Sequence, residues 1–373
     1  MSADDIPMDF TDFYAPDYTG ARNKFRAAAD AAGAALSVYA HPHASGPAGE
    51  PLAIDVAHLG DTRAPRQLIL ISGAHGQEGY AGSAAQVAWL RSAPARQLPA
   101  GLGVLLVHGL NPYGFAHGTR TTENNVDLNR NFAAHLFDPA QPVPANPGYA
   151  ELHASLIPAE WSWDSVADAE AAAQAYGARH GADALFDTRA RGQYSHPDGL
   201  VFGGHHREWS NLTLETIVRE HLAHAGRVGL IDWHTGIGEY GEPFFLCFNA
   251  DGSGQQARAA SWWGEQRVLG VRPHGLARPA YTGLVFHGVE RFLGERPLVG
   301  AVVEFGTRGS NMGHALRLDQ WLRFKAERGT GRYAQLRADM LDAFIPAAQP
   351  WRDATVRHGV AITQQAVDGL AAW

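Results

Sequence analysis

The sequence of 373 residues contains very little cysteine. Its single cysteine, Cys247, excludes an internal disulfide bond and any metal site that is built from several cysteines. Aromatic and aliphatic residues flank Cys247 on both sides, so we expect it to pack as a small apolar residue in the core.

Basic charge and long apolar runs are also scarce. Lys and Arg number 30 against 38 Asp and Glu, and the resulting net charge of -8 provides no basic surface for nucleic acid. No apolar run approaches the length that crosses a bilayer, so we expect no membrane partner. The start, MSADDIPMDF, is acidic where a secretory signal would be basic and then apolar. We therefore expect a cytoplasmic protein.

Apolar residues, in contrast, are plentiful. They make up 45% of the chain and charged residues 18%, which suffices for a buried core and argues against disorder. An α/β protein with one large sheet can reach this length as a single unit. The composition therefore favours one catalytic domain with insertions.

The most informative stretch is LILISGAHGQEG, which begins at Leu68. Its apolar run predicts a buried strand that delivers His75 and Glu78 to the edge of a sheet. Imidazole nitrogen and carboxylate oxygen are standard zinc ligands, and the glycines around them allow a tight turn. The pattern is short and the chain has 19 histidines, so taken alone it favours ordinary polar loop residues.

A helix and a second apolar strand follow this loop. Good helix formers occupy residues 81–92, and residues 103–107 are nearly all apolar. Strand, helix and strand in this order predict a parallel βαβ unit. Sites in such units gather beyond the carboxyl ends of the strands.

The second informative stretch, NPYGFAHGTRTTENNVDLNRNF, provides donors for an anion at Arg120, Asn129 and Arg130. Arginine has a planar fork of donors that matches a carboxylate, and a neighbouring asparagine can add another donor. The alternative is structural: Asp127 and Arg130 pair with each other and lock the loop.

In the third stretch, VGLIDWHTGIG, His234 follows a buried strand over residues 228–231. With His75 and Glu78 it completes a set of two histidines and one glutamate, which leaves a fourth position on zinc open for chemistry. Asp232 either orients a ligand ring or simply caps the strand end.

The fourth stretch, LVGAVVEFGTRG, places Glu304 at the carboxyl end of a buried strand. Burying a carboxylate there costs several kcal/mol unless it is paired or takes part in chemistry. We expect it to act as a general base beside the metal. The alternative is an ion pair with Arg308 or another cation.

The order of these motifs resembles the zinc metallocarboxypeptidase family, the carboxypeptidase A-like enzymes and their bacterial relatives. The resemblance is carried by HGQEG, VDLNRNF, DWHTG and VVEFGT, and GQYSHPDGLVFGG and EWSN are similar to a bacterial subgroup of poorly assigned function. It implies a zinc-exopeptidase-like three-layer α/β/α fold with a mixed, largely parallel central sheet, in one catalytic domain over residues 1–373. The long separation of Arg130 from His234 implies an inserted loop and helix region at about 138–226.

The resemblance also implies the chemical centre. His75, Glu78 and His234 correspond to the ligands of one zinc ion per chain. Glu304 corresponds to the general base that acts on the zinc-activated water.

Substrate contacts follow from the same resemblance. Asn129 and Arg130 correspond to the pair that holds a terminal carboxylate, and Arg120 to the arginine that polarises the scissile carbonyl. Tyr281 is the best match to the family's mobile tyrosine, with Tyr240 as the alternative.

These roles imply a zinc-dependent hydrolase that cleaves an amide bond next to a free carboxylate, in a small peptide or an acylated amino acid. An alternative function is that of an N-acyl amino acid deacylase of the aspartoacylase or succinylglutamate desuccinylase type. Such enzymes have the same HGxE motif, Asn-Arg pair, histidine and glutamate, so the sequence leaves this alternative open. A non-catalytic binding protein on the same scaffold is disfavoured, because every residue that the mechanism needs is present. The oligomeric state stays open.

Overall fold

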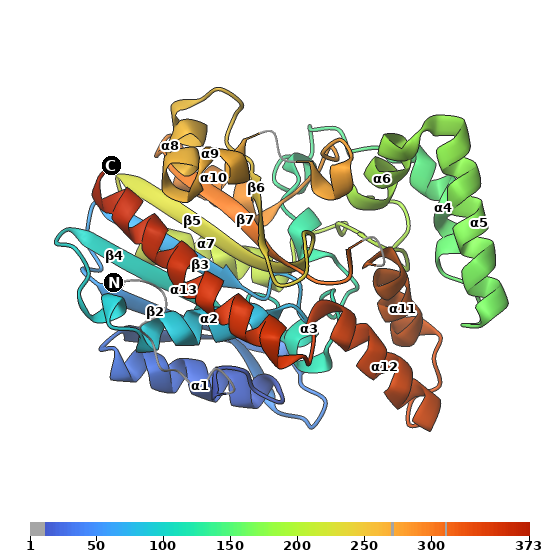
Figure 1. Ribbon diagram of the computed structural model, residues 1–373, viewed down its shortest axis with the longest axis horizontal. Helices are drawn as coiled ribbons and strands as arrows, with labels where there is room; N and C mark the ends of the chain where they lie inside the picture. Colours follow the sequence, from blue (N-terminus) through green and yellow to red (C-terminus); the bar gives the residue numbers. More distant parts are fainter. Residues whose placement is uncertain (1–11, 270–271, 310–311) are drawn as a thin grey trace.

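The computed structural model describes residues 12–269, 272–309 and 312–373 (Figure 1). The acidic start on which the expected localisation partly depends lies outside these residues. None of the helices in the described ranges combines the length and the apolar character that crossing a bilayer requires.

A seven-stranded sheet with the order β1-β2-β4-β3-β5-β7-β6 forms the centre of the fold. Its four central strands, β4, β3, β5 and β7, are parallel, and β1, β2 and β6 add antiparallel edges. The predicted mixed α/β sheet is confirmed, including the parallel β3-α2-β4 unit. The strands are β1 (Ala35–Ser45), β2 (Pro51–Gly60), β3 (Arg66–Ser72), β4 (Leu102–His108), β5 (Arg227–Gly236), β6 (Pro243–Cys247) and β7 (Leu298–Gly306).

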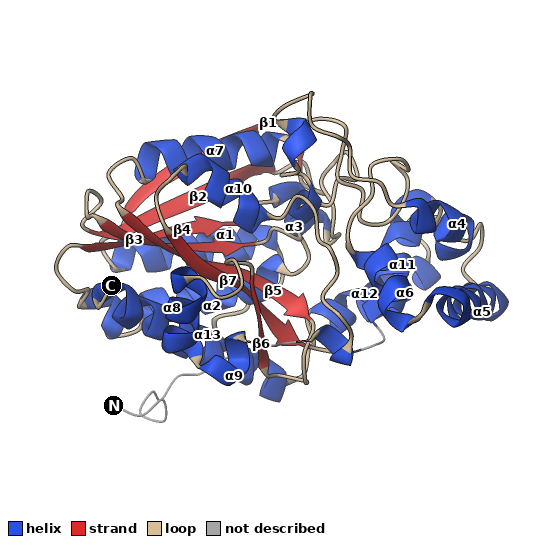
Figure 2. Ribbon diagram, turned by 90° about the horizontal axis from the view of Figure 1, so that it is seen from above, coloured by secondary structure: helices blue, strands red, loops and turns tan. Residues whose placement is uncertain are grey.

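Helices cover both faces of the sheet, which completes the predicted three layers (Figure 2). One face carries α1 (Tyr18–Ala31), α2 (Gly79–Arg91), α8 (Gly254–Trp263) and α13 (Gln349–Ala371). The other face carries α7 (Trp209–His221) and α10 (Val285–Leu293). Shorter helices in the described chain are α3 (Pro112–His117), α9 (Glu265–Val268), η3 (Pro94–Arg96), η4 (Leu128–Arg130), η5 (Ala134–Leu136) and η6 (Pro273–Gly275).

Apolar patterning explains why these elements pack in this way. All nine residues of β7 are buried, and in β3 only Arg66 is not, as expected for parallel strands that helices cover on both faces. In α10 the buried residues Val285, Phe286, Val289 and Leu293 form one stripe at helical spacing. Cys247 is buried in the core, as predicted.

A second group of helices lies beyond the carboxyl ends of the parallel strands, on the right of Figure 1. This group comprises α4 (Pro147–Leu156), α5 (Trp163–His180), α6 (Ala182–Ala190), α11 (Met312–Phe324) and α12 (Gly331–Phe344). Of these helices α11 and α12 pack in an apolar cluster of their own, whereas α13, which follows them, covers the sheet.

The region predicted as an insertion, residues 138–226, contains α4 to α7. Of these helices α7 packs on the sheet, whereas α4 and the residues around it form a small apolar cluster away from it. The limits of the insertion and the single domain therefore stay predictions.

One strand is longer than predicted. We expected the strand before His234 to end at residue 231, but β5 continues to Gly236 because it pairs with β7 along its whole length. His234 therefore lies within the sheet and not in a loop after it. It pairs with Glu304 of β7, and the pairing of β5 with β3 extends to Trp233, the residue before it.

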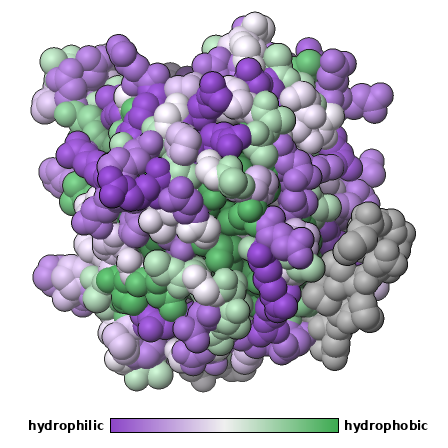
Figure 3. All heavy atoms as spheres, turned by 90° about the vertical axis from the view of Figure 1, so that its left-hand side faces the viewer, coloured by the Kyte–Doolittle hydropathy of each residue, from purple (hydrophilic) through white to green (hydrophobic). Residues whose placement is uncertain are grey.

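The surface is mixed in character. Figure 3 shows the side of the molecule that lies on the left of Figure 1, where hydrophilic side chains predominate and apolar ones occupy smaller areas between them. The chemical groups that the sequence singled out lie at the carboxyl ends of the parallel strands and not on this face.

Candidate functional site

The loop between β3 and α2 carries His75 and Glu78. Two backbone hydrogen bonds attach it to a neighbouring loop: Gly76 N donates to Arg120 O at 3.2 Å, and Gln77 N donates to Thr119 O at 3.1 Å. At Gly76 an added Cβ would lie 2.0 Å from the backbone carbon of Gly114, so only glycine fits there. The loop that holds two of the predicted ligands is thus packed backbone to backbone.

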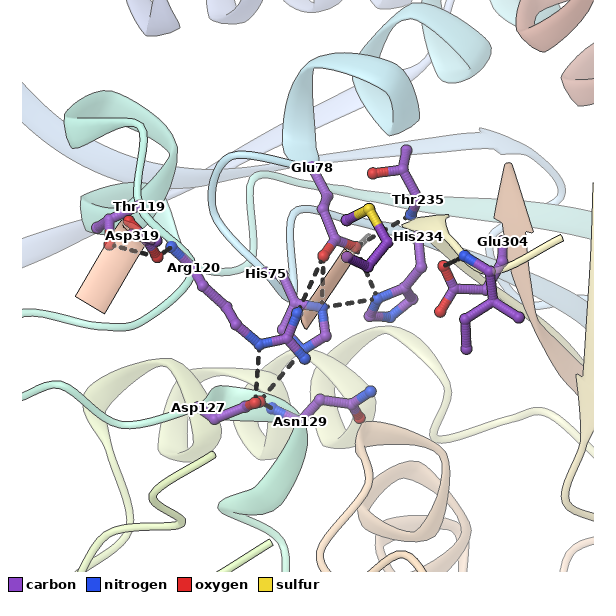
Figure 4. Close-up of polar contacts among 12 residues, drawn as sticks. His75, Glu78, Thr119, Arg120, Asp127, Asn129, His234, Thr235, Glu304 and Asp319 are labelled. Atoms are coloured by element: carbon purple, nitrogen blue, oxygen red, sulfur yellow. Dashed lines mark hydrogen bonds and ion pairs between the residues drawn. The ribbon is translucent and has the colours of Figure 1, made fainter. Parts of the chain in front are cut away.

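The three predicted metal ligands meet at one point (Figure 4). His75 Nδ1 lies 3.0 Å from His234 Nδ1 and 3.0 Å from Glu78 Oε1, and His234 Nδ1 lies 3.1 Å from Glu78 Oε2. All three side chains are buried, with exposed fractions of 4%, 2% and 1% for His75, Glu78 and His234. No other group of metal-ligating side chains converges in this way within the described ranges.

This donor set fits a divalent metal ion. Two imidazole nitrogens that face each other at hydrogen-bond distance can share only one proton, so a cation between them suits their lone pairs better. Two nitrogens and one carboxylate oxygen are also the ligand types of catalytic zinc. The sequence therefore identified three residues that the structure brings together as a possible metal site.

A carboxylate lies behind each of the two imidazoles. His75 Nε2 is 3.1 Å from Asp127 Oδ1, and His234 Nε2 is 3.0 Å from Asp232 Oδ2. Such carboxylates fix the tautomer of a ligand histidine, which leaves the opposite nitrogen, Nδ1, to face the metal. Asp232 thus has the ring-orienting position that the sequence left open. Asp127 pairs with His75 and Arg120, so the alternative of an Asp127–Arg130 pair is wrong.

The charges of the centre stabilise one another. Burial alone would raise the pKa of Glu78, but His75 and His234 outweigh it and hold that pKa below its ordinary value. Burial alone would lower the pKa of His234, but Asp232 and Glu78 raise it well above its ordinary value. In the same way Arg120 and His75 overcome burial and hold the pKa of Asp127 well below its usual range.

Glu304 lies beside this centre on β7, in register with His234 on β5. It is 8% exposed, and Ile237 N donates a hydrogen bond of 3.4 Å to its Oε2. Burial, assisted by the charge of Glu78, raises the pKa of Glu304 to about 7. The alternative ion pair is not formed: Arg308 pairs with Asp342, and in the described chain no cation lies within ion-pair distance of Glu304.

Arg120 bridges two of the carboxylates. Its Nε donates to Asp127 Oδ2 at 2.9 Å, and its Nη1 donates to Glu78 Oε1 at 3.1 Å. Asp319 of α11, which the sequence analysis did not single out, accepts from the backbone N of Arg120 at 2.9 Å and from Thr119 Oγ1 at 3.0 Å. An aspartate within a helical pattern gives no local signal for such a role, because surface helices contain many.

The predicted carboxylate-binding pair lies close to Tyr281. Arg130 Nε and Nη2 donate to Ala190 O at 3.1 and 2.6 Å, and Nη1 donates to Asn129 O at 2.5 Å. Each nitrogen thus has a backbone partner, and only the second N–H groups of Nη1 and Nη2 remain for a ligand. Its guanidinium lies 5.1 Å from the centroid of the Tyr281 ring. Asn129 Oδ1 accepts from Val285 N at 2.8 Å, and its amide nitrogen has no hydrogen-bond partner in the part of the chain that the structure describes.

The two candidate tyrosines differ in position. Tyr281 lines the same cavity as the metal group, and burial raises its pKa to about 12, so that it keeps its phenolic proton. Tyr240 is 53% exposed and does not line that cavity. The structure therefore favours Tyr281 over Tyr240.

A cavity of about 340 Å³ joins these groups. Its polar lining contains His75 and Glu78 of the metal group, Glu304, Asn129 and three arginines: Arg120, Arg130 and Arg189. Its apolar lining comes from α6, α11 and the strand ends and includes Leu185, Phe186, Leu246, Phe248, Met312 and Leu316. The contributions of α6 and Arg189 were missed, because the alanine-rich helices of this region give no sign of facing a pocket.

Comparisons with known proteins place the chain as follows. No curated protein matches its sequence. Similar solved structures include a candidate metallopeptidase from Shewanella denitrificans, 14% identical with a TM-score of 0.49 over 96% of this chain and 92% of that one. They also include a candidate carboxypeptidase from Burkholderia mallei, 14% identical with a TM-score of 0.44 over 94% and 67% of the two chains.

A third similar structure is the succinylglutamate desuccinylase from Chromobacterium violaceum, 17% identical with a TM-score of 0.36 over 87% of this chain and 77% of that one. At these identities and scores the similar structures assign no activity to this chain. One family model, described as protein of unknown function (DUF2817), matches residues 14–358, which is most of the chain. The chain therefore belongs to the DUF2817 family.

Proposed function

We propose that the protein is a zinc-dependent hydrolase that cleaves an amide bond next to a free carboxylate. The observation that carries this proposal is the convergence of His75 Nδ1, His234 Nδ1 and the Glu78 carboxylate within 4.8 Å of one another. Asp127 and Asp232 turn both imidazoles toward the same point. These are the features of a catalytic rather than a surface metal site.

The three ligands would hold the ion. A zinc ion in such a site supplies Lewis acidity and lowers the pKa of water toward neutrality. Glu304, beside the ligands and not paired with a cation, accepts a proton from the attacking water and returns it to the leaving amine. A pKa of about 7 matches a group that must both accept and donate near neutral pH.

Arg120 is placed to stabilise negative charge on the carbonyl oxygen of the substrate. Its guanidinium lines the cavity, and its bonds to Asp127 and Glu78 fix it before any substrate arrives. Donors that are already in position favour the transition state, in which that charge develops, over the ground state.

Asn129, Arg130 and Tyr281 would bind the free carboxylate of the substrate. The amide nitrogen of Asn129 and the remaining N–H groups of Arg130 can donate hydrogen bonds to a carboxylate. Tyr281 keeps its proton and lies against Arg130, so that it adds a further donor.

The test is hydrolysis of N-acyl amino acids and dipeptides by the zinc-loaded protein, beside the same compounds with the free carboxylate converted to a carboxamide. We expect hydrolysis of the acids, much slower hydrolysis of the carboxamides, and loss of activity when a chelator removes the metal. Equal rates for acids and carboxamides would contradict the role of Asn129 and Arg130. The absence of hydrolysis from the whole panel would contradict the proposal.

A further inference from the structure

Arg189, near the end of α6, lines the main cavity and also a smaller adjoining cavity of about 40 Å³. Its Nε is buried and has no hydrogen-bond partner. No carboxylate of the described chain lies within ion-pair distance of it. Arg189 is thus a half-buried cation without an ion pair at the wall of both cavities.

Arg317, on α11, lines the smaller cavity together with Arg189. It is 3% exposed, its Nε donates to Leu156 O at 2.9 Å, and its guanidinium lies 5.6 Å from the centroid of the Trp161 ring. Its Nη2 is buried without a partner. Packing thus holds the side chain in place, while one nitrogen of its guanidinium has no hydrogen-bond partner.

The charges of this pair are compensated only in part: neither arginine forms an ion pair within the described residues, although Asp319 also lines the smaller cavity. Burial lowers the pKa of both side chains, and the charge of Arg189 lowers that of Arg317 further. Glu170 acts in the opposite direction on both, but it forms an ion pair with neither within the described residues. Two neighbouring cations without a counter-ion destabilise a fold, and a bound anion removes that cost.

The other two arginines of the main cavity have more partners within the protein. Arg120 is paired with Glu78 and Asp127, and most of the contacts of Arg130 are to backbone carbonyls. Within the described residues Arg189 forms no hydrogen bond and Arg317 forms one, so these two arginines have fewer partners than Arg120 and Arg130.

The position of the smaller cavity indicates which part of a substrate would reach the arginine pair. Arg120 and Thr121 line it, whereas Asn129, Arg130 and Tyr281 do not. Under the proposed function Arg120 faces the scissile carbonyl, so the arginine pair lies on the acyl side of that bond. The carboxylate-binding pair lies on the amine side.

We infer that Arg189 and Arg317 form a second anion site, and that the substrates are amides with an anionic group on each side of the scissile bond. The orientation of the substrate in this inference rests on the proposed function. A carboxylate at the end of a short acyl chain suits the site, because two guanidinium groups can bind both of its oxygens. Acyl groups derived from dicarboxylic acids have this chemistry.

The experiment measures binding by calorimetry to the full-length, zinc-loaded Glu304→Gln protein, which leaves the compounds intact. The compounds are the N-succinyl, N-glutaryl and N-adipoyl derivatives of L-phenylalanine, beside the neutral N-butyryl, N-valeryl and N-hexanoyl derivatives of the same lengths. We expect at least one charged compound to bind about 10- to 100-fold more tightly than its neutral counterpart, as for a charge-assisted contact. Equal affinities at every length, or no binding of any compound, would overturn the inference.

Variants locate the effect. Arg189→Gln should bring the ratio of charged to neutral affinity close to one, whereas Arg191→Gln, whose side chain pairs with Asp187 and does not line either cavity, should leave the ratio unchanged. Arg317→Gln should act in the same way as Arg189→Gln. Because Arg317 also packs on Trp161, its thermal unfolding is compared with that of Arg317→Lys, which retains the charge. An unchanged ratio in Arg189→Gln would contradict the site.

Failure of this inference can be told apart from failure of the proposed function. If the wild-type protein hydrolyses neutral N-acyl amino acids and shows no preference for charged acyl groups, the second anion site is wrong and the hydrolase stands. If charged compounds bind in an Arg189-dependent way and no amide is hydrolysed, the anion site stands and the hydrolase is wrong.

Discussion

Charged side chains form ion pairs at one end of the cavity, whereas the two arginines at the other end form none within the described residues. At the metal centre, each ligand contacts another charged group: Glu78 and Asp127 contact Arg120, and both histidines contact carboxylates. At the other end, Arg189 and Arg317 have buried N–H groups without partners.

This difference shows how each region depends on a ligand. Ion pairs link the charged groups of the metal centre, so these pairs can orient the ligands when the protein folds. The neighbouring positive charges of the arginine pair raise the free energy of the folded protein, and an anionic ligand would lower it again on binding. We interpret the metal centre as a site that is preformed for an ion, and the arginine pair as a site that distinguishes between substrates.

The largest effect is expected from replacing Glu304, the proposed base beside the metal ligands. Glu304→Gln should lower kcat by about 10²- to 10⁴-fold, because the variant can no longer accept a proton from water. Zinc should stay bound, because Glu304 is not among the converging ligands. Metal analysis and steady-state kinetics on the same preparation check this. Loss of zinc from the variant would contradict the role given to Glu304.

Stability tests the contrast between the two ends directly. In the metal-free protein, Arg120→Met should lower the free energy of unfolding by about 3–5 kcal/mol, because it leaves two buried carboxylates without their cation. Arg189→Met should leave that energy unchanged or raise it by about 1 kcal/mol, because it removes a half-buried charge that has no ion-pair partner. Denaturant unfolding of both variants gives the comparison. Equal destabilisation would show that Arg189 has a partner in the folded protein.

A smaller effect is expected from replacing a carboxylate that contacts one of the ligand histidines. Asp127→Asn should weaken zinc binding by about 10- to 100-fold, because the amide no longer fixes the tautomer and orientation of the His75 ring. Competition with a chromophoric chelator measures the affinity. Asp342→Asn is a matched control, because Asp342 pairs with Arg308 away from the centre. An effect of the same size in the control would contradict the prediction.

The smallest expected effect is that of pH on zinc affinity. Because the pKa of His234 lies well above its ordinary value, the metal-free protein holds a proton on this side chain near neutrality, and zinc must displace it. Affinity should therefore rise with pH, by at most about tenfold per unit for one displaced proton. Titration from mildly acidic to mildly alkaline pH, corrected for the protonation of the competing chelator, checks this. An affinity that is flat or falls with pH would contradict it.

Much of the metal centre could be predicted from the sequence, because its residues lie at the ends of apolar strands. Such a run predicts a parallel strand, and parallel strands bring their carboxyl ends to one edge of the sheet. His75 and Glu78 follow such a run, and Glu304 ends another. His234 was placed beyond its strand, because sequence alone does not show how far β5 pairs with β7.

The arginine end could not be predicted, because nothing local distinguishes its residues. Arg189 and Arg317 occur in helices with ordinary surface patterns, and they come together only when α6 and α11 pack beyond the sheet. Helix packing at the edge of a fold depends on contacts that are far apart in the sequence.

The most direct test is the metal content of the purified protein, measured by mass spectrometry for the wild type and His75→Ala after both are supplied with zinc. The account predicts one zinc ion per chain in the wild type and none retained in the variant, with both proteins folded by circular dichroism. A wild type that retains no zinc, or a folded His75→Ala that retains as much zinc as the wild type, would contradict it.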